Sequence, residues 1–178
     1  MKKILLIISI FIIVPVLFLT GCGNNEKEKT EYKTIEYYDK GYGFKTTFKY
    51  DATNNFKDVE YDDESGKARE LEFSNEELGI DFNMYYTDLG KNLAEDAKKS
   101  RADKKYYKEY KFNGHDAYCY SDYDDQLYLI INLKEDKNHV YYNLFVSLEA
   151  DNTDTVVFDV FTQQVLQDFF NSIEFEEV

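Results

Sequence analysis

Apolar and polar residues alternate along several short stretches of the chain, a pattern typical of strands that bury one face. In residues 42–50, Phe44, Phe48 and Tyr50 alternate with lysine and threonine. The pair Asn113–Gly114 favours a tight hairpin between two such stretches, because both residues tolerate the positive φ of a type I′ turn. The pattern predicts strands at residues 42–50, 70–74, 80–86, 106–112, 115–120, 127–133 and 140–148, and a closing strand at 173–175.

Two other stretches have the spacing of helices. Leu89, Leu93 and Ala97 recur at helical intervals, which predicts a helix that Asp88 caps and that ends near Arg101. Residues 51–67 are polar and are expected to be mostly turn.

A longer helix is expected near the C-terminus, ending at Asn171–Ser172, because a wide apolar stripe recurs there. The stripe consists of Val157, Phe158, Phe161, Val165 and Phe169. Asp151, Thr153 or Asp154 could cap its N-terminal end.

The order of these elements predicts an α+β domain, an antiparallel sheet of about six strands flanked by helices on both faces. This order, and the ending Phe169-Phe170-Asn171-Ser172-Ile173-Glu174-Phe175, resembles the fold of the photosystem extrinsic protein PsbP and its bacterial lipoprotein relatives. The resemblance implies helices on both sides of the sheet and a mainly non-enzymatic role in binding or assembly. No catalytic residue is carried over from it.

The N-terminus has the order of a secretory signal peptide. Lys2 and Lys3 precede an apolar run, and Leu19-Thr20-Gly21-Cys22 follows it. These four residues resemble the lipobox of bacterial lipoproteins. The resemblance implies cleavage between Gly21 and Cys22, and acyl chains such as palmitate on Cys22. The alternative is a retained transmembrane helix, which would leave the same domain outside the cell.

The expected organisation is therefore a signal peptide at 1–21, a lipidated flexible tether at 22–33 and one domain at 34–178. The mature chain would hold 19 basic and 35 acidic residues, a formal charge of −16. Such a charge repels phosphate backbones and anionic lipid head groups, which excludes nucleic-acid binding and favours cationic partners.

Few residues suggest metal, cofactor or thiol chemistry. His115 and His139 are expected at strand ends about 9–10 Å apart, too far to share a zinc ion without further ligands. Cys119 would be the only cysteine of the mature domain besides Cys22, and its position beside Ala117 indicates a small core thiol. No metal and no cofactor is expected.

The acidic turn that contains Asp122, Asp124 and Asp125 is a candidate for weak calcium binding, since calcium prefers such oxygens. It is no EF-hand, because Leu127 and Leu133 occupy the places of the required glycine and glutamate. A charge run of this kind is also typical of a solvated turn.

Four tyrosines form a candidate binding surface, because the alternation places them opposite the apolar rows of their strands. They are Tyr118, Tyr120, Tyr128 and Tyr141. If no helix covers them, they offer an aromatic platform for a protein or glycan. If a helix covers them, they form a second core layer.

These observations together predict a lipid-anchored binding protein on the extracytoplasmic face of the cell membrane. Its partner is expected to be a protein of the cell envelope, and no enzyme activity is expected. The alternatives are a carrier or sensor for a small ligand or cation, and a hydrolase that acts on wall polymers.

Overall fold

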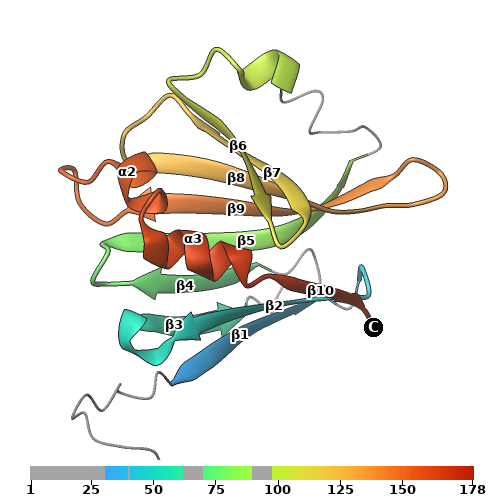
Figure 1. The fold of residues 1–178 in the computed structure, drawn as a ribbon, viewed down its shortest axis with the longest axis horizontal. Helices are drawn as coiled ribbons and strands as arrows, with labels where there is room; N and C mark the ends of the chain where they lie inside the picture. The colour runs from blue at the N-terminus through green and yellow to red at the C-terminus, as the bar shows by residue number, and fades with distance from the viewer. Residues whose placement is uncertain (1–30, 40, 62–69, 90–97) are drawn as a thin grey trace, which may run out of the picture.

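The computed structural model describes residues 31–39, 41–61, 70–89 and 98–178, and these form two antiparallel sheets (Figure 1). The larger sheet has seven strands in the order β3-β4-β5-β9-β8-β7-β6, and the smaller has the order β1-β2-β10. The strands are β1 (Tyr32–Asp39), β2 (Phe44–Asp51), β3 (Phe56–Tyr61), β4 (Leu71–Asn75), β5 (Ile80–Leu89), β6 (Tyr106–Phe112), β7 (His115–Ser121), β8 (Gln126–Glu135), β9 (Tyr141–Ala150) and β10 (Glu174–Glu177).

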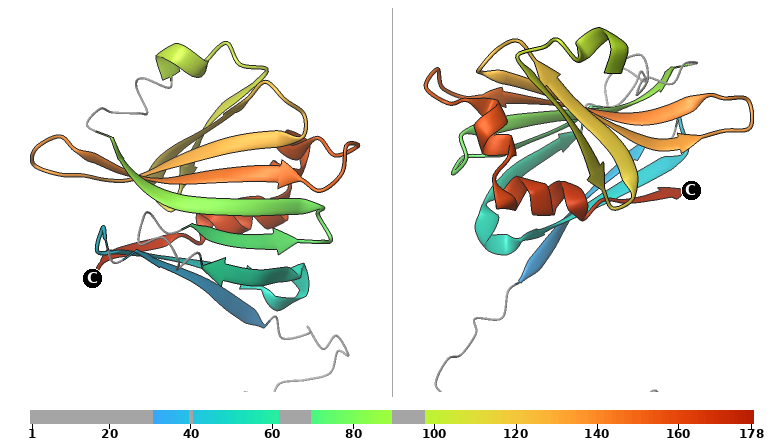
Figure 2. Two further views of the ribbon diagram at one scale, coloured as in Figure 1. Left: turned by 180° about the vertical axis from the view of Figure 1, so that it is seen from behind. Right: turned by 45° about the horizontal axis from the view of Figure 1, so that its top comes forward.

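The described helices are short. They are the 3₁₀ turn η1 (Ala52–Asn54), α2 (Val157–Phe161) and α3 (Gln164–Asn171), and residues 98–101 are also helical. Figure 2 shows α2 and α3 on one side of the larger sheet, with the smaller sheet turned toward that side. We call this side of the seven-stranded sheet the inner face and the opposite side the outer face.

The prediction of helices on both faces of the sheet was wrong in this respect. The PsbP-like resemblance had implied the same arrangement. The structure is mostly β, with few short helices. The smaller sheet packs on the same side as α2 and α3, and β1 contributes to that packing because its alternation buries Ile35 and Tyr37. Tyr32 and Lys33, which were expected in the tether, already belong to this strand.

Two further expectations about local structure were wrong. β3 lies within the stretch that was expected to be turn, and its backbone pairs with β4. Asp88 lies inside β5, which continues to Leu89, so it cannot cap a helix there. Residues 90–97 of that expected helix lie outside the described part of the chain.

The C-terminal helix is broken into two rather than continuous. Gln163 is extended (φ −66°, ψ 148°) and separates α2 from α3. The Gln167 side chain donates to the Phe161 carbonyl at 2.7 Å, which satisfies an acceptor near the break. Val156 precedes α2 with no side-chain cap, so Asp151, Thr153 and Asp154 do not cap it.

The hairpin expected at Asn113–Gly114 is confirmed. Both residues have positive φ, 45° and 90°, and the strands β6 and β7 pair directly across them. The Asn113 side chain also donates to the Ile173 carbonyl at 2.6 Å. The turn therefore fixes the end of the larger sheet to the C-terminal segment.

The core lies between the inner face, the smaller sheet and the two helices, and the ring of Phe169 is near its centre. Phe169 contacts rings from four strands of both sheets, with centroid distances of 4.7 to 6.4 Å. These rings are Phe48, Phe56, Phe73 and Phe82. One helical side chain thus joins the two sheets.

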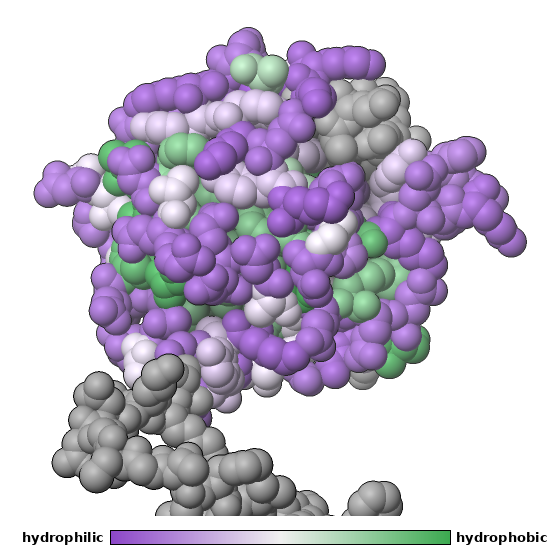
Figure 3. All heavy atoms as spheres, in the orientation of Figure 1, coloured by the Kyte–Doolittle hydropathy of each residue, from purple (hydrophilic) through white to green (hydrophobic). Residues whose placement is uncertain are grey.

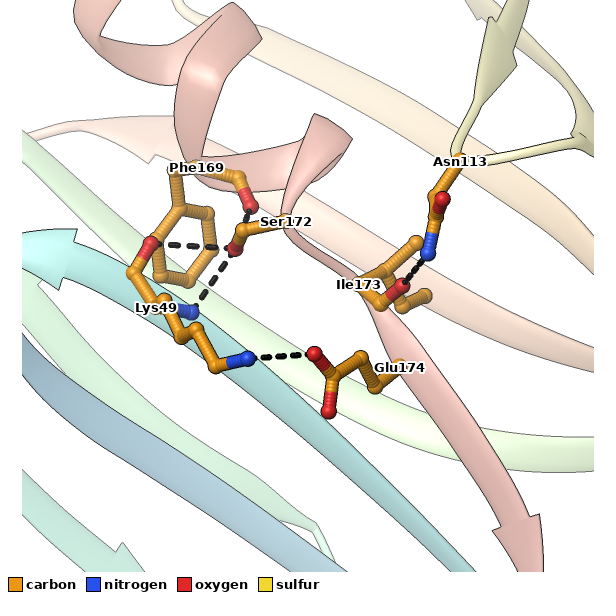
Figure 4. Close-up of polar contacts among 6 residues, drawn as sticks. All are labelled: Lys49, Asn113, Phe169, Ser172, Ile173 and Glu174. Carbon is orange, nitrogen blue, oxygen red and sulfur yellow. Dashed lines mark hydrogen bonds and ion pairs between the residues drawn. The ribbon is translucent and has the colours of Figure 1, made fainter.

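Polar contacts hold the same junction together (Figure 4). The Lys49 backbone N–H donates to the Ser172 hydroxyl at 2.7 Å, and that hydroxyl lies within donating distance of the Phe169 and Lys49 carbonyls. The Lys49 ammonium pairs with Glu174. These contacts fix the end of α3 and the start of β10 against β2.

Hydrophilic residues form most of the surface on the side of α2 and α3 (Figure 3), and hydrophobic residues show between them in small areas. The apolar residues of this side are therefore used mainly in the core.

Replacing Phe169 by alanine is expected to destabilise the protein by about 3–5 kcal/mol, because it opens a cavity where both sheets meet. Chemical denaturation would measure the loss. Gln164→Ala, at an exposed position of the same helix, is the control and should change stability by less than about 0.5 kcal/mol. Similar losses in both variants would contradict the central role of this ring.

Stability should fall at alkaline pH. Burial raises the pKa of Cys119 to about 12 and raises the pKa values of Tyr37 and Tyr86. The unfolded chain loses these protons from about pH 9 while the folded chain keeps them, so the free energy of unfolding decreases as pH rises. The expected loss between pH 8 and 10.5 is roughly 2–4 kcal/mol.

Urea unfolding at a series of pH values would measure this loss, and Cys119→Ala should reduce it. A stability that stays constant up to pH 10.5 would contradict the prediction.

Candidate functional site

The outer face of the larger sheet carries the most distinctive surface of the described residues. Alternation along the strands places apolar residues on the inner face and a mixture of aromatic and acidic residues on the outer face. In the left view of Figure 2 this face is turned forward, and α2 and α3 lie behind the sheet.

A chain of ring contacts crosses four adjacent strands on this face. Tyr120 on β7 lies 5.4 Å from Tyr128 on β8, measured between ring centroids. Tyr128 lies 5.7 Å from Phe145 on β9, and Phe145 lies 4.8 Å from Tyr85 on β5. We call these four residues the aromatic row.

The aromatic row is covered at one end and partly open at the other. Tyr120 is 7% exposed, whereas Tyr128, Phe145 and Tyr85 are half-buried. Phenols are neutral at physiological pH, and desolvation raises the pKa values of Tyr85 and Tyr120 still further. The open end therefore presents neutral ring surface with hydroxyl groups.

Cations of the protein itself lie at the covered end. The Arg101 guanidinium carbon is 4.3 Å from the centre of the Tyr120 ring, within cation–π distance. Three residues earlier in the same short helical segment, the Lys98 ammonium lies 3.1 Å from Glu109 on β6. The outer face of the sheet thus binds one arginine and one lysine of the helical segment 98–101.

An acidic hollow of about 410 Å³ lies beside the open end of the row. Its lining comes from β4, β5 and β9, and β5 lies between the other two strands and pairs with both. The lining residues are Glu72, Phe73, Ser74, Asp81, Phe82, Asn83, Ser147 and Glu149. Asn83 lies two positions before Tyr85 on β5, and Ser147 lies two positions after Phe145 on β9. Two positions along a strand span about 6–7 Å, which is the distance from the row to the near edge of the hollow.

Among the described residues, the carboxylates of this hollow have no basic partner, whereas lysines pair with several carboxylates elsewhere. Asp81 and Glu149 face each other directly across β5 and β9, a like-charge pair that is unfavourable without a cation. Within the described ranges, Glu72, Asp81 and Glu149 form no ion pair, and Glu149 accepts a hydrogen bond from Gln126 at 2.8 Å. In contrast, Asp116 and Glu109 are paired with lysines.

Asn83 adds a further polar group to the hollow. Its amide nitrogen donates to Glu70 at 2.9 Å. Its side-chain oxygen is buried and accepts no hydrogen bond from the part of the chain that the structure describes. The hollow is therefore rich in acceptors and poor in donors.

The structure separates the four tyrosines that the sequence grouped. Tyr118 and Tyr120 are buried, at 3% and 7% exposure, and pack with Ile130 in a second, smaller core on the outer face. Tyr128 lies at the edge of this core, half-buried. Tyr128 is paired with Ser147 on β9, and Tyr141 lies six positions, or about 20 Å, from Ser147 along that strand. Tyr141 is therefore not part of the row. Their role in binding stays a prediction.

The acidic turn is partly neutralised by lysines. Asp122 pairs with Lys104, and Asp124 pairs with Lys105 and accepts a hydrogen bond from the Tyr106 hydroxyl. Hydrogen bonds from these lysines lower the pKa values of both carboxyls. Asp125 is exposed. Calcium binding by these three residues stays a prediction.

Neither histidine lies in a group of potential metal ligands. His115 contacts the Asn132 carbonyl at 3.1 Å, and His139 contacts Glu135 at 2.6 Å. Over the described ranges, no three His, Cys, Asp or Glu side chains are grouped so as to hold a metal ion. Cys119 is fully buried, which confirms the expectation of a core thiol.

A second hollow of about 640 Å³ lies between the smaller sheet and α3. Aromatic and apolar side chains line it together with two carboxylates and one lysine. These residues are Tyr32, Lys49, Tyr50, Asp51, Asn54, Val165, Asp168, Phe169 and Ser172. It corresponds in place to the pocket between sheet and helices that a small-ligand carrier would use.

Part of the site could be predicted from the sequence. The alternation of apolar and polar residues assigns Tyr85 and Asp81 to the outer face of β5. It assigns Phe145 and Glu149 to the outer face of β9. It could not show that Tyr85 and Phe145 are neighbours, because β5 and β9 are more than fifty residues apart in the chain but adjacent in the sheet.

The lipobox residues Gly21 and Cys22 lie outside the described residues, as does most of the expected tether. In the described ranges, every helix is too short or too polar to cross a membrane.

Comparisons of the chain with protein-family models, with curated proteins and with solved structures found no significant match. The resemblance to the PsbP-like family therefore stays a prediction based on element order.

Proposed function

We propose that this chain is a non-enzymatic binding protein that a lipid on Cys22 holds at the extracytoplasmic face of the cell membrane. Its partner in this proposal is a protein of the cell envelope, and the binding site is the outer face of the seven-stranded sheet. The aromatic row is the observation that carries the proposal, because it continues across four strands on a face that α2 and α3 do not cover.

Three properties of this face support protein recognition. Tyrosine provides contact area and a hydrogen bond at low cost in side-chain entropy, and aromatic residues are enriched in protein interfaces. The row lies on strands in the middle of a sheet, which holds the rings in fixed positions. The adjacent hollow supplies charged groups that could orient a partner.

A small-ligand carrier is the second candidate, and the hollow between β2 and α3 is the observation that favours it. Its volume is in the range of known ligand pockets, and its lining combines rings with a few polar groups. The outer-face proposal ranks first because it accounts both for the rings and for carboxylates that have no basic partner among the described residues.

The anchoring part of the proposal predicts that Cys22→Ala abolishes labelling by a palmitate analogue in cells. Cys119→Ala is the matched control and should keep full labelling, because its thiol is buried in the core. Mass spectrometry should find residues 1–21 absent from the labelled protein. Labelling that persists in Cys22→Ala would contradict lipid attachment at this residue.

The binding face can be tested with a photo-cross-linking phenylalanine analogue in intact cells. At Tyr85 or Tyr128 the analogue should yield a discrete product with one envelope protein, because both rings lie half-buried in the row. At Tyr32, which is 70% exposed on the smaller sheet, the product should be absent.

The same product should disappear when Cys22→Ala removes the anchor. A product from Tyr32 alone, or none from any position, would contradict the proposed face. Stabilisation by a small molecule that Val165→Trp abolishes would then favour the carrier.

A further inference from the structure

We propose that the segment bound by the outer face carries arginine, with its guanidinium group stacked on Tyr85 and Phe145 and bonded to the carboxylates of the acidic hollow. This inference deepens the proposed function and rests on it. It names the chemistry of the partner, a basic polypeptide segment.

The negative charges of the hollow favour binding of a cation. Asp81 and Glu149 face each other on neighbouring strands, and Glu72 lies on the next strand of the same hollow. None of the three forms an ion pair within the described residues, although lysines neutralise carboxylates at many other surface positions. A cation placed here would relieve repulsion that the free protein keeps.

The covered half of this side of the sheet shows how a basic segment can be held. Arg101 stacks over Tyr120, and Lys98 pairs with Glu109 three residues away in the same segment. Tyr120 belongs to the aromatic row, so the open end repeats the same combination of ring and carboxylate. Tyr85 and Phe145 supply the ring surface. Glu72, which faces Asn83 two positions from Tyr85, supplies the nearest carboxylate of the hollow. Asp81 and Glu149 lie two positions further along their strands.

Arginine suits this arrangement better than lysine. Its planar guanidinium stacks on aromatic rings and donates in a fork to carboxylates, whereas an ammonium group is a compact and strongly hydrated charge. The hydroxyls of the two serines of the hollow add acceptors for the remaining N–H groups. A nucleic acid or an anionic membrane would instead be repelled by this face.

The experiment uses the protein from Cys22 to Val178 without lipid and a fluorescent peptide with two arginines three residues apart. Binding is measured by fluorescence anisotropy at physiological salt. Matched peptides carry lysine or neutral citrulline at the same two positions. We expect the arginine peptide to bind about threefold or more tightly than the lysine peptide, and the citrulline peptide not to bind.

Two variants with equal net charge separate specific binding from general attraction to an acidic protein. Asp81→Asn with Glu149→Gln removes two charges from the hollow, and Asp154→Asn with Asp159→Asn removes two exposed charges near α2. The first pair should weaken binding about tenfold, and the second less than about twofold. Tyr85→Leu should also weaken binding, by about threefold or more. Thermal unfolding confirms that each variant is folded.

Equal weakening by both charge variants, equal binding of arginine and citrulline peptides, or no binding at all would overturn the inference. If the peptide fails while cross-linking from Tyr85 and Tyr128 still succeeds, only the basic character of the partner is wrong. If both fail, the proposed function is wrong as well.

Discussion

The packing of Phe169 against both sheets is the interaction on which the rest of the structure depends. The mature chain would have a single cysteine besides Cys22, so no disulfide within the domain joins the two sheets. Phe169 contacts Phe48 on the smaller sheet and Phe82 on the larger one, and the Ser172 and Glu174 contacts fix the following residues to β2. The C-terminal segment thereby closes the core on the inner face.

This closure has a consequence for function. Because α2, α3 and the smaller sheet all lie on the inner side, none of these three packs on the outer face. Part of this face forms the small core around Tyr118, and another part carries half-buried rings beside carboxylates that pair with no described basic residue. The like-charge pair Asp81–Glu149 is unfavourable without a cation, and the exposed part of the rings offers contact area, so the binding proposed for this face would give both a physical reason.

Local sequence determined the elements better than their arrangement. Alternation found the strands of the larger sheet from β4 to β9, and Asn113–Gly114 fixed the β6–β7 turn. It missed β1 and β3, whose apolar residues are few and flanked by charged ones. It also predicted one C-terminal helix, because the apolar stripe continues through the break at Gln163. Periodicity records which residues are buried and does not record a change of helix axis.

For the candidate site, the sequence by itself determined the residue types and the face to which each belongs. It determined the acidic charge, the aromatic content and the N-terminal pattern that predicts lipid attachment at Cys22. Only the tertiary structure decided that Tyr85 and Phe145 are neighbours, that Asp81 faces Glu149, and that Arg101 covers Tyr120. The physical reason is that these contacts depend on strand order and register, which long-range packing sets and local patterns do not encode.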